Sequence, residues 1–468
     1  MREGEVSMAA SHADPYRVEA NADKALFVSM LIKDIELQPA VLDLVDNSVD
    51  SARSVSPEDL SKFEIDLEVS GDHFIVKDNC GGIDLETARN YAFRFGRPKE
   101  YAGVPGSVGQ FGVGMKRALF KLGRKFEVES RSKNSYFQLS VDVEKWALDT
   151  ANDWHFTMTE VDDKYDPATE GTGTIVKVSN LHGNVIEDFS SALILGQLRE
   201  QLRLRHQGVL QQGLTIRLNG EKLRGLAPSL LSGPGFSPFN KKITIPAGED
   251  DVHVTIVAGI VARSVEDLAD DGEAEAFSGN KDNKEAGWWV FCNDRLLIYA
   301  DRTSTTGWGA SGPAYHPQYR EFRGYVYFES RNTSLLPWNT TKTGVDQDSK
   351  IWRQVLGEMK SALSEVLSVI SRIKSEKRDG STDEDKPVSR AADDAKPTPI
   401  RKLPLSPRMI SPPLRSAKRP LPRKTTQKVQ YDVDYQRYRD VRQVLGVSST
   451  AEVGRRTFDY FYDREVEE

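Results

Sequence analysis

Residues 41–52 read Val-Leu-Asp-Leu-Val-Asp-Asn-Ser-Val-Asp-Ser-Ala, and the rest of the chain is best interpreted outward from this stretch. Its apolar residues recur at helical spacing, which predicts a helix with one buried face. Asp43 and Asn47 are four positions apart and therefore project from the same face of that helix. A carboxylate one turn from a carboxamide can orient a water molecule and supply an oxygen ligand to Mg²⁺. Such pairs are also common on solvated helix faces, so this one needs support from other blocks.

A second block, Val76-Lys-Asp-Asn-Cys-Gly-Gly-Ile83, ends a predicted hairpin that begins near Ile65. The apolar alternation stops at Asp78, which places a carboxylate at the end of a strand. Gly81 and Gly82 permit positive φ and let the backbone approach a flat ligand closely. The carboxylate at this place can accept a hydrogen bond from an exocyclic amine. An ordinary Asp-Asn-Gly-Gly turn is the alternative interpretation.

A third block is a glycine-rich loop that runs into a predicted helix near 113–122. The N–H groups of such a loop and the dipole of the helix favour phosphate groups. The loop is not a P-loop, because Met115 separates the last glycine from Lys116 and Arg117 stands where Ser or Thr is required. The residues of this block are Gly109, Gln110, Phe111, Gly112, Val113, Gly114, Met115 and Lys116.

These blocks, followed by Gly173-Thr174-Ile175 before a predicted strand, stand in an order and spacing that resembles the Bergerat-fold GHKL ATPases. That superfamily includes gyrase, the MutL mismatch-repair proteins, the heat-shock chaperones, the microrchidia proteins and histidine kinases. The resemblance covers residues 16–185 well and extends more loosely to about 375. It implies an α+β fold, in which a Bergerat-type α/β sandwich forms the ATPase domain and a transducer-like α/β domain follows.

The resemblance also implies ATP and Mg²⁺ as cofactors. Asn47 resembles the Mg²⁺-binding asparagine of the superfamily. Asp78 matches the aspartate that binds the adenine amino group, and Gly82 matches the glycine beside it. Thr174 matches the threonine near that aspartate and its water. The loop of residues 109–116 matches the ATP lid, so its side chains and glycines are expected to bind nucleotide, with Lys116 beside the phosphates.

Two positions depart from the pattern of the superfamily. Asp43 stands where the hydrolytic members have their general-base glutamate, and it is one methylene shorter. The resemblance therefore implies a catalytic role for Asp43, with a poorly placed attacking water and slow hydrolysis. Cys80 replaces the first glycine of the usual D-x-G-x-G, so close approach of the backbone there depends on Gly81 and Gly82.

The stretch from Leu336 to Asp346 resembles the loop by which the transducer domain of gyrase and MutL relatives sends a lysine to the γ-phosphate. Lys342 is the lysine at that place, and a lysine there would stabilise the transferring phosphoryl group as a point charge. A solvated surface lysine is the alternative. Histidine kinases lack this domain and carry a phosphoacceptor helix before the ATPase, and the polar segment around His12 is no such helix.

The composition excludes several other classes of protein. The 468 residues carry 63 basic and 70 acidic side chains, so no global positive field draws the whole chain to nucleic acid. Cys80 and Cys292 are the two cysteines, which excludes a disulfide framework and a cysteine-built zinc site. No apolar run approaches the roughly 20 residues that a membrane helix needs. We expect a cytoplasmic protein, or a nuclear one if the source is eukaryotic, with no membrane partner.

The chain divides into five expected segments. They are a disordered arm (1–15), the ATPase domain (16–185), a transducer-like domain ending in a long helix (186–375), a disordered Pro-rich and basic linker (376–430) and a small helical interaction module (431–468). Within the folded part, strands are expected at 125–130, 136–142, 174–179 and 214–218, and helices near 87–95 and 190–206.

The long helix carries an apolar seam at alternating spacings of four and three residues, from Trp352 to Ile373. A seam of this kind can form a coiled-coil dimer contact. The alternative is a helix packed on its own domain, which the shortness of the seam favours.

The function that these features favour is an ATP-gated clamp that dimerises with Mg-ATP and hydrolyses it slowly. Residues 401–428 contain nine Lys or Arg, six Pro and no acid, which fits DNA binding through phosphate contacts. The module at 431–468 is a candidate site for a protein partner. Two alternatives remain open: a chaperone-like or scaffold ATPase that acts on proteins, and a nucleotide-sensing module with negligible turnover.

Overall fold

The computed structural model describes residues 23–33, 35–96, 114–149, 154–262, 284–309, 312–339, 342, 344–378, 386–413 and 429–466. The chain separates into two units, which meet in sequence at Pro412 and Pro413 and are described one at a time. The larger unit holds two main sheets, and the smaller unit holds two helices. Among the described residues, no helix is long and apolar enough to cross a membrane.

The first sheet has eight strands in the order β5-β4-β3-β6-β2-β1-β7-β8. Its neighbours pair antiparallel except β1 and β7, which run parallel. Apolar and polar residues alternate along β1, so Ile65, Leu67 and Val69 are buried on one face. The strands are β1 (Glu64–Val69), β2 (His73–Asp78), β3 (Gly123–Arg131), β4 (Tyr136–Asp142), β5 (Met158–Asp162), β6 (Gly173–Leu181), β7 (Thr215–Leu218) and β8 (Glu221–Lys222).

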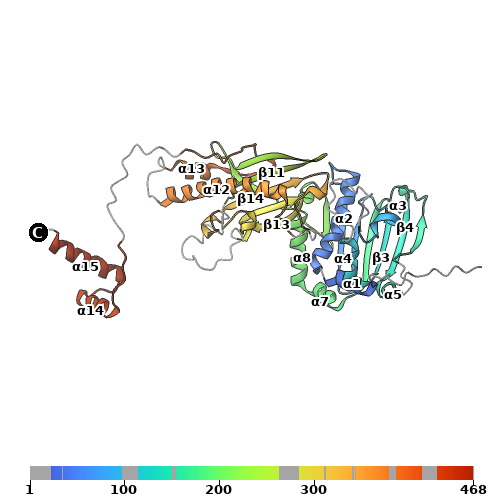
Figure 1. The fold of residues 1–468 in the computed structure, drawn as a ribbon, viewed down its shortest axis with the longest axis horizontal. Coiled ribbons are helices and arrows are strands. Elements are labelled where there is room, and N and C mark those ends of the chain that lie inside the picture. Colours follow the sequence, from blue (N-terminus) through green and yellow to red (C-terminus); the bar gives the residue numbers. More distant parts are fainter. Residues whose placement is uncertain are drawn as a thin grey trace, which may run out of the picture. The chain divides into compact units, whose positions relative to one another are not determined.

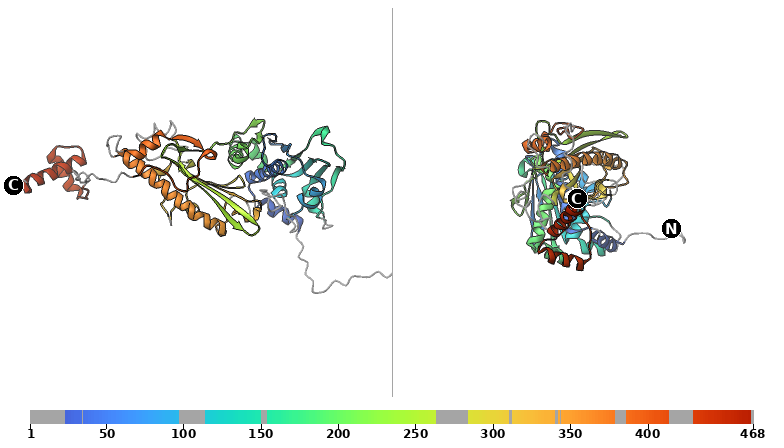
Figure 2. Two further views of the ribbon diagram at one scale, coloured as in Figure 1. Left: turned by 90° about the horizontal axis from the view of Figure 1, so that it is seen from above. Right: turned by 90° about the vertical axis from the view of Figure 1, so that its left-hand side faces the viewer.

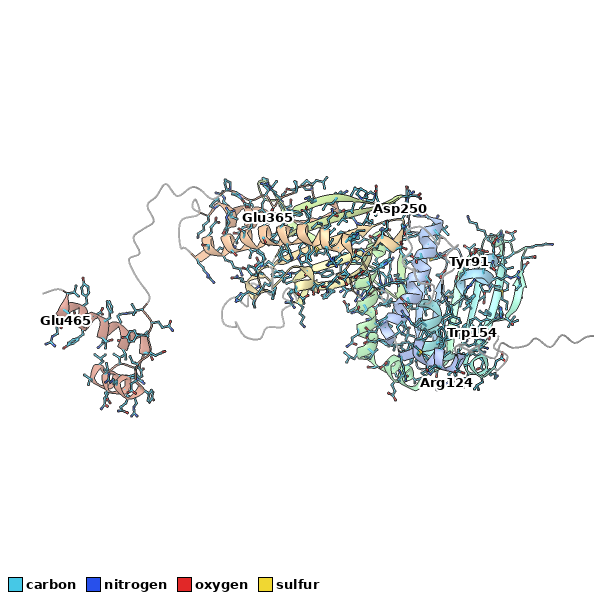
Figure 3. The ribbon with its side chains drawn as sticks, in the orientation of Figure 1. Tyr91, Arg124, Trp154, Asp250, Glu365 and Glu465 are labelled. Atoms are coloured by element: carbon cyan, nitrogen blue, oxygen red, sulfur yellow. The ribbon has the colours of Figure 1, made fainter. Side chains whose placement is uncertain are left out.

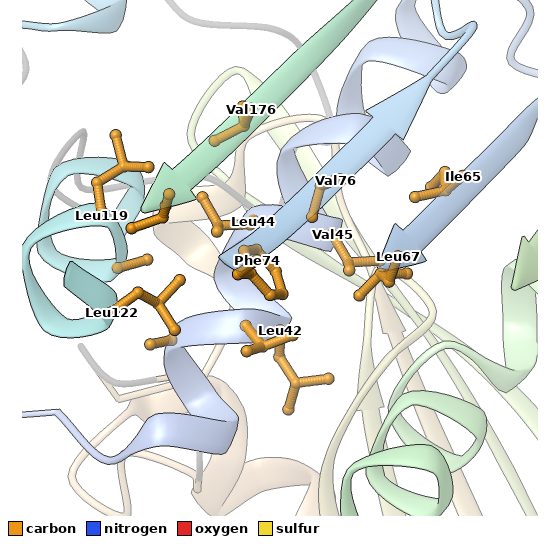
Figure 4. Close-up of a cluster of buried hydrophobic side chains, with 14 of the residues drawn as sticks. Leu42, Leu44, Val45, Ile65, Leu67, Phe74, Val76, Leu119, Leu122 and Val176 are labelled. Atoms are coloured by element: carbon orange, nitrogen blue, oxygen red, sulfur yellow. The ribbon is translucent and has the colours of Figure 1, made fainter. Parts of the chain in front are cut away.

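Helices pack against this sheet through apolar faces. Leu42, Leu44 and Val45 of α2 meet Phe74 of β2 and Leu119 of α4 in one buried cluster, which Figure 4 shows. The region expected as a helix near 87–95 is instead the short helix α3 followed by a π-helical turn, η1. The helices of this part are α1 (Lys24–Lys33), α2 (Leu37–Val55), α3 (Leu85–Thr87), η1 (Ala88–Ala92), α4 (Gly114–Leu122), α5 (Val143–Leu148), α6 (Pro167–Glu170), α7 (Gly183–Ser190), α8 (Ala192–Arg205) and α9 (Gln207–Gln211).

The second sheet has five strands in the order β10-β11-β14-β12-β13. Its apolar core is separate from that of the first sheet and is rich in tryptophan and phenylalanine, with Trp288, Trp308 and Phe322 fully buried. The strands are β10 (Phe239–Ala247), β11 (Asp250–Ile260), β12 (Gly287–Cys292), β13 (Arg295–Asp301) and β14 (Phe322–Glu329). Three 3₁₀ turns connect and flank them: η2 (Ser304–Thr306), η3 (Pro317–Tyr319) and η4 (Thr333–Leu335).

The long helix α12 (Lys350–Arg378) lies along this second sheet (Figures 1 and 2). Its apolar seam faces the sheet, and Trp352, Met359, Leu363 and Val366 are each at most 1% exposed. A seam buried in its own domain is not free to pair with a second chain. The interpretation of α12 as a helix packed on its own domain is therefore confirmed.

The chain after α12 packs back on the larger unit at residues 386–413, which corrects this part of the expected linker, while 379–385 and 414–428 lie outside the described residues. Residues 376–430 are predicted to be disordered, but α13 (Pro387–Asp394) packs on α12, and β15 (Lys396–Pro399) pairs with β9 (Ser229–Ser232). The turn η6 (Ile400–Lys402) follows β15. Glu365 of α12, labelled in Figure 3, accepts a hydrogen bond from the N–H of Met409 at 2.8 Å.

The physical reason for the error is that a few apolar side chains anchor a polar segment. Val388, Ile400 and Leu403 are buried, yet they are too widely spaced to produce a helical or strand period. The predicted boundary at residue 185 also differs from the sheet topology, because β7 and β8 complete the first sheet.

The smaller unit contains α14 (Tyr435–Leu445) and α15 (Thr450–Glu465), within the segment predicted to be a small helical module. Asp434 caps α14 by accepting hydrogen bonds from the N–H groups of Gln436 and Arg437. Val453 is the one buried apolar residue of the described part of this unit. Tyr435, Phe458 and Phe461 are more than half exposed.

Candidate active site

The polar face of α2 forms the centre of the candidate site. Asp43 is 6% exposed, and each of its carboxylate oxygens faces a cation. Arg117 Nη2 donates to Oδ2 at 3.2 Å, and Lys342 Nζ lies 3.7 Å from Oδ1. The start of α4 is close as well, because a Cβ at Gly114 would lie 3.0 Å from Asp43 Oδ2. Asn47, one turn further along α2, is exposed within an otherwise buried stretch.

Asp78 lies where β2 ends, as the sequence predicts, and its carboxylate is held by three donors. Ser48 Oγ donates to Oδ2 at 2.6 Å, while the N–H groups of Cys80 and Thr174 donate to Oδ1 at 2.9 and 3.2 Å. Burial raises the pKa of Asp78, although these hydrogen bonds oppose the shift. An ionised carboxylate has about four acceptor sites, so one remains for a ligand donor.

The glycines after Asp78 are required by the packing of the backbone. Gly82 has a φ of +73°, and a Cβ there would lie 2.1 Å from the carbonyl oxygen of Arg131. Gly173, on the neighbouring strand, would bring a Cβ within 2.0 Å of the Asp78 carbonyl oxygen. Cys80 is fully buried and burial strongly raises the pKa of its thiol, so it acts as a core residue in place of a glycine.

Lys342 comes from the loop after β14 and reaches the first sheet's helices. It is 8% exposed, with a left-handed φ of +53°, and its N–H donates to the carbonyl oxygen of Asn339 at 3.0 Å. Its Nζ lies 3.7 Å from Asp43 Oδ1 and also 3.7 Å from Asp46 Oδ2. The loop therefore delivers a nearly buried cation between two carboxylates of α2.

Lys116 has a different environment from Lys342. It is 2% exposed, and its Nζ donates to the carbonyl oxygen of Ala92 at 3.0 Å, which holds the π-helical turn η1 against α4. Met115, next to it, packs against the first core. The other residues of the predicted lid, Gly109, Gln110, Phe111, Gly112 and Val113, lie outside the described residues.

Asp46 is the most heavily paired carboxylate of the site, and sequence reasoning assigns it no role. Its Oδ1 accepts from Arg295 Nη1 at 2.6 Å and lies 3.0 Å from His206 Nε2. Burial by itself would raise the pKa of Asp46, but Arg295, His206 and Lys342 together hold it well below the usual range. The position of Asp46 next to Asn47 in the sequence is a signal that could have placed it in the site. Nothing in the sequence links Asp46 to Arg295.

The residues present fit an ATP site with one magnesium ion. Mg²⁺ takes few protein ligands and keeps several waters, so the exposed amide oxygen of Asn47 beside Asp43 is sufficient. In the described part of the chain, no group of three or more His, Cys, Asp or Glu side chains could hold a metal ion by itself. The metal is therefore expected to depend on nucleotide phosphates for its remaining ligands.

Comparison with known families points to the same part of the chain. Residues 35–172 match the family described as histidine kinase-, DNA gyrase B-, and HSP90-like ATPase. The matched region contains α2, the end of β2 and α4, and it stops just before Gly173 and Thr174. No curated protein matches the chain. The match supports a GHKL-type ATPase domain in this region, and with the two mixed sheets it agrees with the predicted α+β architecture.

Proposed function

We propose that this chain binds Mg-ATP at the site formed by α2, the end of β2 and α4, and hydrolyses it slowly. The observation that carries the proposal is the arrangement on α2, where Asp43 lies between Arg117 and Lys342 beside the exposed Asn47. A general base, a metal ligand and phosphate-directed cations are the parts that phosphoryl transfer to water requires.

Each residue has a distinct task in this proposal. Asp78 accepts a hydrogen bond from the adenine amino group through the acceptor site that its three donors leave free. Asn47 gives its amide oxygen to the metal, and bound Mg-ATP supplies the phosphoanhydride bond that is cleaved. Asp43 orients the attacking water and takes its proton. Lys342 stabilises the charge that develops on the transferring phosphoryl group.

Slow turnover is expected from the side chain at position 43. Aspartate is one methylene shorter than the glutamate found in hydrolytic relatives, and its two oxygens are engaged by Arg117 and Lys342. A base whose lone pairs point at cations has to give up one of those contacts to take a proton. This observation also favours the second candidate, a nucleotide sensor with negligible turnover.

We further propose that the chain works as an ATP-gated dimer of the microrchidia- or MutL-like kind, acting on DNA or on a DNA-associated complex. The basic residues of 401–428 support the contact with DNA, and Arg401, Lys402 and Arg408 are exposed. The exposed aromatic residues of α14 and α15 support a contact of that module with a protein partner. A chaperone-like or scaffold ATPase would use the same module without DNA.

ATP turnover with and without duplex DNA, measured beside the oligomeric state with a non-hydrolysable ATP analogue, tests the proposal. A clamp that acts on DNA predicts turnover stimulated by DNA and a dimer that forms with the analogue. Turnover that DNA leaves unchanged favours the scaffold. Tight ATP binding with no turnover in either case favours the sensor, and the absence of ATP binding overturns the proposal.

A further inference from the structure

A buried charge cluster joins α2 to the second sheet next to Lys342. Arg295, the first residue of β13, is 6% exposed and donates from Nη1 to Asp46 Oδ1 at 2.6 Å. The same Nη1 lies 3.1 Å from His206 Nε2. His206 Nε2 also lies 3.0 Å from Asp46 Oδ1, and its Nδ1 lies 3.1 Å from the carbonyl oxygen of Leu202.

The hairpin that carries Arg295 is fixed to α2 at a second point. Arg53, near the end of α2, donates to the carbonyl oxygen of Asn293 at 2.9 Å and to Asp294 Oδ2 at 2.7 Å. Gln212 also donates to Asp294 Oδ2, at 2.9 Å. Arg53 and Gln212 thus hold the β12–β13 turn from two sides. This turn places the guanidinium of Arg295 against Asp46.

The two oxygens of Asp46 have different surroundings. Oδ1 is engaged by Arg295, whereas Oδ2 is buried and has no hydrogen-bond partner among the described residues. Oδ2 faces Lys342 Nζ at 3.7 Å, the same distance that separates Nζ from Asp43 Oδ1. Asp43 and Asp46 therefore compete for one lysine.

The charge balance decides that competition. With Arg295 present, the negative charge of Asp46 is already compensated, so its pull on Lys342 is weak. Without Arg295, the nearest permanently charged side chain to Asp46 would be Lys342, because burial lowers the pKa of the closer His206 ring, and an uncompensated buried charge is costly. The lysine would then move from its shared position to Asp46 and away from Asp43.

We infer that Arg295 is a positioning residue for hydrolysis, which neutralises Asp46 and so keeps Lys342 free to act beside Asp43. This inference rests on the proposed function. Arg295 contacts Asp46 and His206, which have no proposed contact with the nucleotide or the water, and it acts through Asp46 on Lys342. A purely structural brace would make the same contacts, so the test has to separate the two roles.

Steady-state kinetics of Arg295→Gln, Lys342→Met and the double variant separate them. Lys342→Met is expected to lower kcat by about 10²-fold, as for loss of one charge-stabilising group. Arg295→Gln is expected to lower kcat by roughly tenfold, with KM for ATP changed less than about twofold, because the nucleotide contacts stay intact. If Arg295 acts through Lys342, the double variant has the kcat of Lys342→Met alone.

Arg53→Gln is the matched control. It loosens the same hairpin at Asp294 but leaves the charge of Asp46 compensated. Its effect on kcat is expected to be small and to multiply with that of Lys342→Met. A second experiment removes both charges of the pair: the double variant Asp46→Asn with Arg295→Gln is expected to restore kcat toward that of the natural chain. This double variant also tests the inference if Arg295→Gln alone fails to fold.

A readout without nucleotide checks the position of Lys342 directly. Competitive acetylation of lysines, quantified by mass spectrometry, measures how readily each amine reacts. In Arg295→Gln the tighter pair with Asp46 should slow labelling of Lys342 by about tenfold, and Asp46→Asn in the same chain should reverse it. Lys121 serves as the internal reference.

Two results overturn the inference while leaving the proposed function intact. One is a kcat of Arg295→Gln equal to that of the natural chain, with unchanged labelling of Lys342. The other is an Arg295→Gln effect that multiplies with Lys342→Met as Arg53→Gln does. If Lys342→Met leaves kcat unchanged in the natural background, or if no turnover is seen at all, the proposed chemistry itself is wrong.

Discussion

Lys342 Nζ lies 3.7 Å from Asp43 Oδ1, although Asp43 is on a helix packed against the first sheet and Lys342 is in the loop after β14 of the second sheet. The lysine reaches this place from a left-handed backbone conformation, which costs a non-glycine residue about 1–2 kcal/mol. The surrounding loop holds it there, with Trp338 bridged to Val345 and Asn339 accepting from the Lys342 N–H. The contact makes the second sheet part of the site.

Asp78→Asn should abolish ATP binding rather than slow turnover alone. The carboxylate accepts from Ser48, Cys80 and Thr174, and an amide group would place a donor against one of these donors as well as losing the acceptor for adenine. Calorimetry with Mg-ATP measures the loss. Asp72→Asn, in the exposed β1–β2 turn, is the control and should bind normally. Normal ATP binding by the Asp78→Asn variant would show that Asp78 does not bind the adenine.

Asp43→Ala should retain Mg-ATP and stop hydrolysis. Removal of a general base typically costs about 10²–10⁴ in rate and leaves ligand contacts in place. Asn47→Ala should instead lose metal-dependent ATP binding, so the two variants separate the two functions of one helix face. Single-turnover rates and binding isotherms are the measurements. An unchanged rate in Asp43→Ala would mean that the water is activated elsewhere.

Gly82→Ala should destabilise the ATPase domain by about 3 kcal/mol or more, since a Cβ at 2.1 Å from the Arg131 carbonyl oxygen forces the backbone to move. Gly220→Ala is a matched comparison, because Gly220 also has positive φ (+79°) but nothing lies within 4 Å of its Cβ position. That variant should lose only about 1–2 kcal/mol, the cost of the left-handed backbone. Urea unfolding of both proteins gives the difference, and equal losses would contradict the argument.

His206 should make the folded protein less stable as the pH falls below its ordinary pKa. Burial lowers the pKa of His206, which Arg295 reinforces although Asp46 opposes it. Below pH 6.5 the unfolded chain therefore binds a proton that the folded chain does not, and stability is lost. Between pH 7.5 and 5.5 the loss is up to about 1.4 kcal/mol. It should be absent in His206→Gln and kept in His316→Gln, where the histidine is exposed.

The basic tail should carry the salt-dependent part of DNA binding. Ending the chain after Ser375 would cut α12 and remove α13 and β15, so the test uses point substitutions within 414–428. Four Lys or Arg→Gln changes there should reduce the salt slope by up to about 3.6. The same number of changes in α14 and α15 is the control. The substituted residues of the tail are Lys418, Arg419, Arg423 and Lys424. The control residues of α14 and α15 are Arg437, Arg439, Arg442 and Arg455.

The local parts of the site could be predicted from the sequence. The helix over 41–52, the hairpin that ends at Asp78 and the start of α4 each have a short-range signal, either a period or a turn. Lys342 could be singled out through the resemblance of its loop. The cluster of Asp46, His206 and Arg295 could not, because three residues from distant segments meet only after both sheets have formed.

The parallel pairing of β1 with β7 has a consequence for how this protein is made and handled. Until residues 215–222 have emerged from the ribosome, β1 ends the growing sheet as an edge strand with unpaired N–H and C=O groups. Such an edge is a template for pairing with another chain and promotes aggregation. An ATPase fragment cut at residue 172 or 185 would keep that edge open permanently. A fragment intended to stay soluble should extend past Lys222.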